Sequence, residues 1–448
     1  MYDKFYNGLT GDIVTPCDKQ YDKARQIWNR AIQKFPSIIV YCYNNNDVGN
    51  AICFAIKNNI EIRIRTGGHN YEGYSVGNCI LVIDISRMNK LELDENRRVL
   101  KAQGGVINTQ VYELLGNKGY PFPSGTCPTV GLAGLILGGG WGLSCRYFGL
   151  ACDSLLSIDI VNYEGKVVTA NEYINSDLFW ACKGGGGGNF GVVTSMTFRI
   201  PNKVESVCLV EFYLANAMVE DMEQFLKIWQ NWLKNLDERM TVVSRLYNSP
   251  EDGMAIYGNG IFYGSAYEAQ ILLDNFNNIY GMQISVRSMS FIEAIEIIES
   301  SYPNSQMFKS TGRFVQRNYN NEEVENISNI LTRRPIGSVY AAISLYALGG
   351  KVTDIGRTQT AFFYRNSKYI MGIQSVWENP KYANDNIGWV KENFKYIESI
   401  TKGSYINFPF SGLECYQRDY YGGNADKLIR INQRYDPFNV FKFPQSIN

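Results

Sequence analysis

The pattern of apolar and polar positions predicts a β-α-β unit over residues 37–65. The apolar run SIIVYC predicts a buried strand at its start, and three isoleucines that alternate with charged residues over 60–65 predict a half-buried strand at its end. Between the strands, apolar residues at helical spacing predict a helix that begins at Asn45, Asn46 or Asp47.

Beyond this unit, short predicted strands flank a long glycine-rich stretch. Residues 80–86 are typical of a buried strand, a helix is expected after the Gly-Gly pair at 104–105, and residues 154–170 predict a hairpin. Residues 121–149 are crowded with glycine yet carry many apolar side chains. We therefore expect irregular backbone wrapped around something large, and not a solvated linker.

A second glycine run formally contains the pattern G-x-G-x-x-G at Gly186, Gly188 and Gly191. A dinucleotide site of the Rossmann type needs a helix directly after this pattern. Here the following residues, VVTSMTFRI, alternate like a strand. The sequence therefore argues against a Rossmann site.

After Pro201 the chain alternates β-rich runs with amphipathic helices near 217–236, 265–279 and 385–400. The β-rich runs are CLVEFYL, TVVSRLY, AIYGNGIFYG, VYAAISLY, TAFFYR and YIMGIQSVW. Strands joined in this way indicate an antiparallel sheet covered by helices on one face, which places the chain in the α+β class. A last helix, ADKLIRINQRY, is predicted near the C-terminus.

Composition excludes several classes of function. The 448 residues hold 43 basic and 43 acidic side chains, so neither nucleic acid nor an anionic membrane is an expected partner. No apolar run is long enough to span a membrane, and the first residues lack the pattern of a signal peptide. The ten cysteines show neither CxxC nor CxxH spacing, so we expect no metal site, no disulfide framework and a cytoplasmic protein with reduced thiols.

His69 is the only histidine in the chain. It follows the predicted strand at 60–65 through Gly67 and Gly68, where the backbone can bring N–H groups close to a ligand. One imidazole cannot form a histidine metal cluster, but it can act as a base, a ligand or a nucleophile. Because of its position we favour a functional role over that of a loop histidine with purely structural hydrogen bonds.

Several long motifs in one order resemble the berberine bridge enzyme-like branch of the FAD-linked oxidases, which have the vanillyl-alcohol oxidase fold. The motifs are RTGGHNYEGYS, PSGTCPTVGLAGLILGGGWG followed by RYFGLACD, GGGGGNFGVVT, YYGGNADKL, RYDPFNVF and QSI. The resemblance covers nearly the whole chain and implies a two-domain α+β fold. A discontinuous FAD-binding domain would comprise residues 1–203 and 403–448, and a substrate-binding domain with an antiparallel sheet covered by helices would be inserted at 204–402.

The resemblance also implies FAD bonded to two side chains, His69 at the flavin 8α-methyl carbon and Cys127 at flavin C6. An imidazole nitrogen and a thiolate are both competent nucleophiles, although an inert buried thiol is the alternative for Cys127. Most other FAD contacts are expected from backbone N–H groups. The expected cofactor-binding residues are Arg65, Thr66, Gly67, Gly68, His69, Asn70, Ser75, Ser124, Gly125, Cys127, Val130, Gly131, Gly134, Gly139, Gly140, Gly142, Gly191, Val192 and Val193, with Tyr71 and Trp141 expected on the substrate side.

The sequence departs from the family at the general base. The family's Y-x-N-Y segment is Y-I-N-F here, so Phe408 replaces the tyrosine that acts as base in carbohydrate-oxidising members. Tyr405 in the same segment and Tyr346 remain as catalytic candidates, and the pKa of either phenol would have to be lowered by a partner or by the flavin. For each of them the alternative is a packed tyrosine with a satisfied hydroxyl.

The resemblance implies an oxidase that takes a hydride from a hydroxyl-bearing substrate, a sugar, an oligosaccharide or a secondary alcohol. Electrons would pass from FAD to O2 and give hydrogen peroxide. Val130, three residues after Cys127, stands where relatives that react rapidly with O2 carry valine. A biosynthetic oxidoreductase acting on a natural product is the alternative, and Phe408 keeps open a flavin-binding protein with little turnover.

Overall fold

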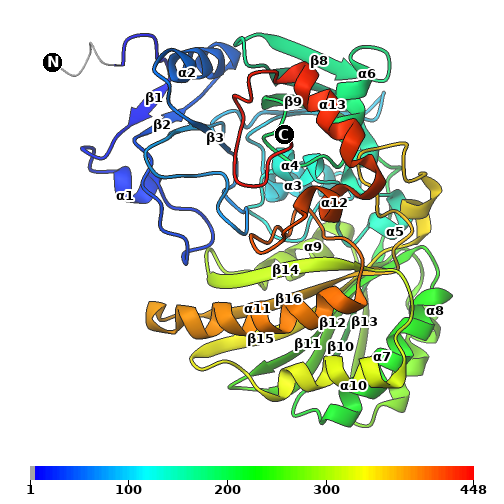
Figure 1. Ribbon diagram of the computed structural model, residues 1–448. Coiled ribbons are helices and arrows are strands. Elements are labelled where there is room, and N and C mark those ends of the chain that lie inside the picture. Colours follow the sequence, from blue (N-terminus) through cyan, green and yellow to red (C-terminus); the bar gives the residue numbers. More distant parts are fainter. Residues whose placement is uncertain (1–5) are drawn as a thin grey trace.

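In the computed structural model, which describes residues 6–448, the predicted β-α-β unit is present, but its two strands are not neighbours. Strand β4 lies between them and pairs with both in parallel, and β1 pairs with β2 antiparallel. The strands are β1 (Asp12–Val14), β2 (Ile38–Tyr41), β3 (Ile62–Arg65) and β4 (Leu81–Asp84). Figure 1 shows this sheet in the upper part of the molecule.

Helix α2 (Asn45–Lys57) connects β2 to β3 and begins at the first of the three predicted positions. Its N-cap is the preceding residue, Asn44, whose side chain accepts hydrogen bonds from the backbone N–H groups of Asn46 and Asp47. This contact satisfies two N–H groups that a helix start leaves without a partner.

A second sheet of five antiparallel strands has the order β5-β6-β9-β7-β8. Its strands are β5 (Leu91–Asp94), β6 (Val99–Gln103), β7 (Leu155–Val161), β8 (Val167–Asn171) and β9 (Val192–Arg199). The predicted hairpin, formed by β7 and β8, is therefore confirmed. The strand that was expected after the glycine run is β9, at the centre of the sheet, and this excludes a Rossmann arrangement there.

The glycine-rich stretch 121–149 is more regular than we expected, because it contains two short helices, α4 and α5. The helices of the N-terminal part are α1 (Tyr21–Ala24), α3 (Asn108–Gly116), α4 (Leu132–Leu137), α5 (Cys145–Phe148) and α6 (Ser176–Ala181). Between α4 and α5 the backbone packs on itself. A Cβ atom at Gly142 would lie 1.8 Å from the carbonyl oxygen of Ser124, so only glycine fits there.

The third sheet has seven antiparallel strands in the order β13-β10-β12-β11-β15-β16-β14. They are β10 (Val207–Leu214), β11 (Met240–Ser249), β12 (Gly253–Phe262), β13 (Gln283–Met289), β14 (Met307–Val315), β15 (Ser338–Ala347) and β16 (Tyr369–Trp377). The predicted antiparallel sheet is confirmed, with two strands, β13 and β14, that the sequence pattern did not reveal.

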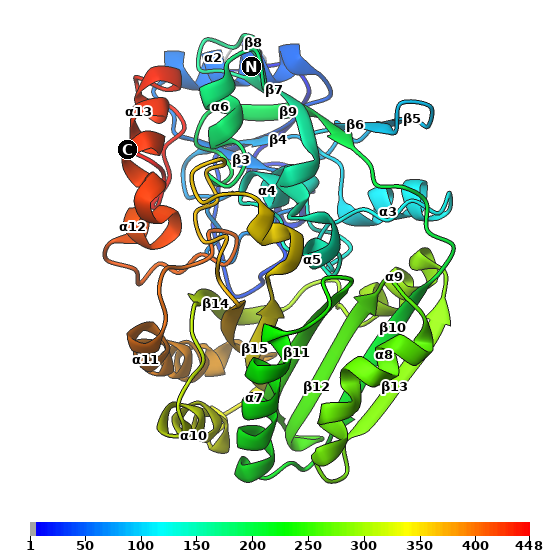
Figure 2. The ribbon, with the colours of Figure 1, turned by 90° about the vertical axis from the view of Figure 1, so that its right-hand side faces the viewer.

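Helices cover one face of this sheet, and Figure 2 shows them on the side away from the upper part of the molecule. They are α7 (Val219–Lys234), α8 (Ala266–Leu273), α10 (Asn321–Asn329) and α11 (Ala383–Ile400). Helix α9 (Phe291–Ser300) instead packs against α3 of the upper part, where Thr109 Oγ1 donates to Glu299 at 2.7 Å. Aromatic side chains make the contact between the sheet and its covering helices, for example Phe212 of β10 with Phe225 of α7, whose ring centroids are 5.6 Å apart. The opposite face of the sheet is therefore free to line the functional site.

The prediction of a strand at TAFFYR was wrong, because residues 360–365 form a loop. Its apolar residues are buried against the glycine run: the N–H of Phe362 donates to the carbonyl of Lys183. The Arg365 guanidinium is fully buried and pairs with Asp153 at 2.7 Å. Here the apolar pattern reflects packing between two parts of the chain, and not strand pairing.

The C-terminal segment returns to the upper part of the molecule, which the N-terminal residues also form. Helices α12 (Tyr416–Tyr421) and α13 (Ala425–Tyr435) lie beside the upper part in both ribbon views (Figures 1 and 2). The side chain of Asn432 donates to the carbonyl of Asn189, at 2.8 Å, which ties α13 to the glycine run. This return matches a two-domain fold with an inserted sheet, and the limits at residues 203 and 402 stay a prediction.

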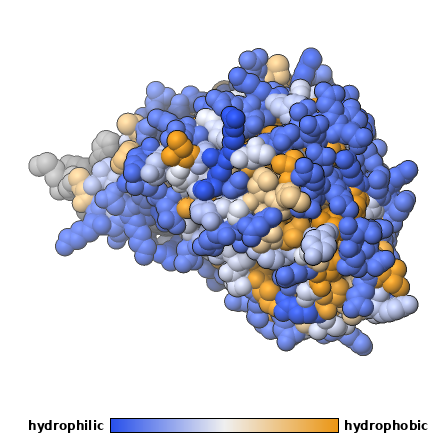
Figure 3. Space-filling model, turned by 90° about the horizontal axis from the view of Figure 1, so that it is seen from below, coloured by the Kyte–Doolittle hydropathy of each residue, from blue (hydrophilic) through white to orange (hydrophobic). Residues whose placement is uncertain are grey.

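Viewed from below in Figure 3, the end of the molecule formed by the seven-stranded sheet and its helices is largely hydrophilic, with apolar side chains gathered over part of it. Within residues 6–448, no helix has the length and apolar character needed to cross a membrane.

Candidate active site

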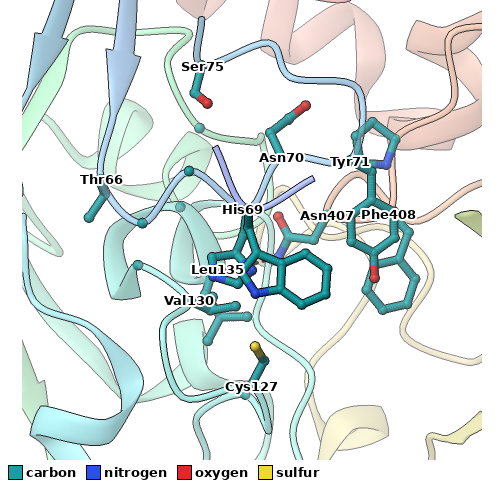
Figure 4. Close-up of a pocket in the computed structure, with 18 of the residues that line it drawn as sticks. Thr66, His69, Asn70, Tyr71, Ser75, Cys127, Val130, Leu135, Asn407 and Phe408 are labelled. Atoms are coloured by element: carbon teal, nitrogen blue, oxygen red, sulfur yellow. Dashed lines mark hydrogen bonds between the residues drawn. The ribbon is translucent and has the colours of Figure 1, made fainter. Parts of the chain in front are cut away.

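One large cavity has a volume of about 720 Å³. It is lined by loops that connect the strands of all three sheets and by the face of the seven-stranded sheet that the helices leave open. Most predicted site residues line it. They are Thr66, Gly67, Gly68, His69, Asn70, Tyr71, Ser75, Gly125, Cys127, Val130, Gly131, Gly134, Trp141, Gly191, Val193 and Tyr346. Figure 4 shows His69 and Cys127 on the same side of this cavity, with Tyr71 and Phe408 at another.

The remaining predicted residues, Arg65, Ser124, Gly139, Gly140, Gly142, Val192 and Tyr405, do not line the cavity. Arg65 is buried behind it and pairs with Asp84 through Nε and Oδ2, 2.5 Å apart. The glycine at 139 packs against the Phe362 ring, where a Cβ atom would lie 2.6 Å from a ring carbon. These residues lie outside the lining of the cavity, and their roles in binding FAD or in catalysis stay predictions.

The loop after β3 presents backbone donors to the cavity. Within residues 6–448, the N–H groups of Gly67, Gly68, His69 and Asn70 donate to no protein acceptor. Gly68 adopts a φ of 70°, in the left-handed region that favours glycine. Successive free N–H groups of this kind form a concavity that binds phosphate oxygens.

The shape of the opposite wall also fits a large planar cofactor. A Cβ atom at Gly134 would meet nothing within 4 Å, whereas one at Gly67 would lie 2.5 Å from the backbone nitrogen of Gly131. The glycine at 67 thus lets its loop contact the loop at Gly131, and the glycine at 134 keeps its part of the wall free of side chains. The Ser75 hydroxyl is buried without a partner in the described part of the chain, as expected for a group whose acceptor is a ligand. The residues present therefore fit FAD.

His69 is held as a neutral imidazole. Its Nε2 atom is 2.8 Å from Thr129 Oγ1, and its ring stacks on Trp28 with centroids 5.1 Å apart. Burial lowers the pKa of His69 to about 4. At neutral pH the ring is therefore uncharged, which is the nucleophilic form.

Cys127 lies on the same wall of the cavity as His69, in the loop that precedes α4. The side chain of Asn108 donates to its carbonyl oxygen at 2.9 Å, which fixes the backbone. Burial raises the pKa of the Cys127 thiol to about 11, although hydrogen bonds from Thr129 lower it. The same Thr129 hydroxyl thus contacts the two side chains that the resemblance assigns to flavin attachment.

Aromatic rings form the wall that faces the seven-stranded sheet. The Tyr346 ring lies edge-on to Trp141 at 4.9 Å and tilted against Phe408 at 5.2 Å. Trp141 is fixed by a hydrogen bond from its Nε1 to the carbonyl of Ala347, 2.8 Å long. Gly372 makes room for the Tyr346 ring, because a Cβ atom there would lie 3.2 Å from it.

Tyr405 is turned away from the cavity. It is 2% exposed, and its hydroxyl oxygen accepts hydrogen bonds from the N–H groups of Gly140 and Trp141 and from the Asn407 side chain, at 3.1 to 3.2 Å. Burial nevertheless raises its pKa to about 12. The hydroxyl therefore works as an anchor for the loop at residues 140–141.

Known families and proteins similar to this chain are described as FAD-binding or named as FAD-linked oxidoreductases. A family model described as an FAD binding domain matches residues 36–171, and one described as berberine and berberine like matches residues 404–448. The chain is 35% identical to the uncharacterized FAD-linked oxidoreductase YgaK of Bacillus subtilis, over 98% of this chain and 97% of that protein. The chain belongs to the berberine bridge enzyme-like FAD-linked oxidoreductases.

Two solved structures share the complete fold. The wild-type BBE-like 1 protein of Physcomitrella patens superimposes with a TM-score of 0.91 at 26% identity, over 100% of this chain and 99% of that one. A chitooligosaccharide oxidase superimposes with a TM-score of 0.90 at 22% identity, over the same shares, which shows the fold alone.

Our sequence analysis of this berberine bridge enzyme-like chain missed the residues that the seven-stranded sheet adds to the cavity. They include Arg245, Tyr257, Tyr340 and Gln374, and the loop before β14 adds Tyr302. One signal was available, since Arg245 is a lone charge within the apolar run TVVSRLY of a predicted strand. Which face of that strand meets the cavity depends on the pairing of distant strands, and the pattern of one strand does not give it.

Proposed function

We propose that the chain is an FAD-dependent oxidase that removes a hydride from a hydroxyl-bearing substrate, a sugar, an oligosaccharide or another secondary alcohol. The flavin would be bonded to both His69 and Cys127, and O2 would accept the electrons to give hydrogen peroxide. The observation that carries the proposal is that these two side chains and the Tyr346 phenol line one cavity.

Bound FAD would supply the acceptor for the hydride. The protein's part is to hold the cofactor and to manage the proton of the substrate hydroxyl. The N–H groups of residues 67–70 would bind the phosphates, and Ser75 would donate a further hydrogen bond. A neutral His69 favours a bond from the ring nitrogen that Thr129 does not contact.

Tyr346 is our candidate for the base that takes the hydroxyl proton onto its phenolic oxygen. Burial raises its pKa above 10, while the charge of Arg245 and a hydrogen bond from Ser344 lower it. Tyr405 does not reach the cavity, and Phe408 has no group that accepts a proton. Tyr71 and Trp141 would hold the ring of the substrate by stacking and exclude water.

The proposal is tested by mixing the anaerobic holoprotein with a panel of sugars, oligosaccharides and secondary alcohols while following the flavin absorbance. At least one compound should bleach the flavin, and admission of air should restore the yellow colour and release one hydrogen peroxide per reduced flavin. Bleaching by none of these compounds would contradict alcohol oxidation.

A further inference from the structure

Arg245 on β11 is a positive charge without a counterpart. It lines the cavity, yet within residues 6–448 its guanidinium has no hydrogen-bond acceptor, no carboxylate partner and no aromatic ring beneath it. A guanidinium does not lose its proton in a protein. The residue is only part-buried, so its charge is open to the cavity. A ligand that displaces water from the cavity would have to supply the partner of this charge, because an unpaired charge away from water is costly.

The strand register aims this charge at the space above the sheet. Arg245 is directly opposite Tyr257 on β12 and Ser344 on β15, and Ser344 is opposite Gly372 on β16. Residues directly opposite each other point to the same face. The row continues through Gly372 to Gly312 on β14, and the Tyr346 ring lies over Gly372. Arg245 and Tyr346 therefore share the face of the sheet that lines the cavity.

Carboxylates of the protein do not supply the missing charge. Asp252, at the rim of the cavity, accepts hydrogen bonds from Tyr213 at 2.8 Å and Tyr247 at 2.6 Å. Glu211, the carboxylate near Tyr257, pairs with Arg287 at 2.7 Å. The side chains that act electrostatically on Arg245 are tyrosines, Tyr340 and Tyr302 foremost, and together they raise its pKa although burial lowers it.

A second polar group in this region also lacks a partner. The Tyr340 hydroxyl is buried, lines the cavity and makes no hydrogen bond within the described residues. Burial raises its pKa, so at neutral pH it is an O–H donor. Arg245 and Tyr340 are thus two donors without a protein acceptor that line one cavity and interact electrostatically.

We infer that Arg245 and Tyr340 bind a carboxylate of the substrate, so that the compound oxidised is a hydroxyl-bearing carboxylic acid. The inference rests on the proposed function and narrows its substrate class. The planar fork of an arginine matches the two oxygens of a carboxylate, and Tyr340 adds a donor. The surrounding tyrosines fit the ring of such an acid, either a sugar acid of the uronic type or an aromatic acid.

A doubly charged phosphate is a poorer match for this pocket. The other basic side chain along the cavity, within residues 6–448, is Arg63. Its Nη1 already donates to the carbonyls of Ile62 and Lys442, and its Nη2 pairs with Glu61. One free guanidinium balances one negative charge.

Binding is measured with the holoprotein by the change in flavin absorbance on titration with two matched pairs, glucuronate with glucuronamide and benzoate with benzamide. In the wild type at least one carboxylate should bind about 10- to 100-fold more tightly than its amide, the range for a charged hydrogen-bonded contact. Arg245→Met should bring the two affinities within a factor of about two, and Arg245→Lys should restore part of the difference. Arg317→Met, a surface change outside the cavity, is the control. The pair that shows the preference separates sugar acids from aromatic acids.

Equal wild-type affinity for acid and amide in both pairs would overturn the inference. So would an Arg245→Met variant that keeps the wild-type preference for the acid over the amide, because the carboxylate would then be bound elsewhere. If the carboxylate preference is present and lost in Arg245→Met, but no alcohol reduces the flavin, the carboxylate-binding site stands and the proposed oxidation fails.

Discussion

Phe408 stacks face to face on Tyr71, with ring centroids 5.1 Å apart and ring planes 4° from parallel (Figure 4). The stack fills the place where the family resemblance implies a catalytic tyrosine, and it turns an aromatic face and not a proton acceptor to the cavity. Besides Tyr71, the cavity-lining phenol that packs on Phe408 is Tyr346, at 5.2 Å between ring centroids. Because Phe408 cannot accept a proton, the candidate for the base lies on β15 and not in the Y-x-N-Y segment.

Tyr346→Phe should lower the rate of flavin reduction by a factor of about 100 to 10,000, the usual cost of a lost general base. The ring packing against Trp141 and Phe408 is kept, so the FAD content should not change. Anaerobic stopped-flow measurement of flavin bleaching gives the rate. Phe408→Tyr is the complementary variant and should raise activity toward sugars. A wild-type reduction rate in Tyr346→Phe would exclude it as the base.

Tyr405→Phe should affect stability instead. The variant leaves the N–H groups of Gly140 and Trp141 and the Asn407 amide without their acceptor in a buried region. The expected loss in free energy of unfolding is about 1–3 kcal/mol, and denaturant titration would measure it. Flavin reduction by the variant should stay within a few-fold of wild type. A large loss of rate with unchanged stability would return Tyr405 to the list of catalytic candidates.

The sequence predicted the parts of the site that lie on local motifs. His69 and Cys127 each sit in a loop whose glycines and neighbours define its shape, and both line the cavity. The substrate side was not predictable in the same way. Arg245, Ser344 and Gly372 meet only through the register of three strands that are far apart in sequence. The environment of Tyr405 was not predictable for a related reason, since a motif gives its position along the chain but not the direction of its hydroxyl.

Flavin reduction should become faster as the pH rises. A base must be deprotonated to act, and burial raises the pKa of Tyr346 above its ordinary value of 10. At pH 7 to 9 the phenol therefore carries its proton, and the fraction of active phenolate grows with pH up to the shifted pKa. The logarithm of the reduction rate, measured anaerobically at constant ionic strength, should rise with pH in the wild type. Tyr346→Phe should lose this rise, and a flat wild-type profile would argue against a tyrosine base.

Val130→Leu should slow the reaction of reduced flavin with O2 while flavin reduction is spared. Val130 lines the cavity close to Cys127, and a leucine adds one methylene to that wall. One methylene in a tight apolar site is worth about tenfold or more in rate. Reoxidation is followed by mixing the reduced protein with oxygenated buffer, and Val130→Ala serves as the smaller matched variant. Equal reoxidation rates in the three proteins would show that this side chain does not control access of O2.

Removal of His69 and Cys127 one at a time should reveal two independent bonds to FAD. The two side chains line the same wall and both contact Thr129, so each lies within reach of one flavin. The imidazole is neutral and ready to react, whereas the Cys127 thiol, with a pKa raised to about 11 by burial, must lose a proton before it can bond. Acid-precipitated wild type should stay yellow, with a mass greater than that of the chain by one FAD. His69→Ala and Cys127→Ala should each keep the flavin by the remaining bond, and the double variant should release it on precipitation. Because attachment by the thiol depends on deprotonation, His69→Ala loaded with FAD should form its bond faster at pH 9 than at pH 7, while Cys127→Ala should show no such dependence. A colourless wild-type pellet would contradict covalent attachment altogether, and a single variant that loses all its flavin would show that only the removed side chain is bonded.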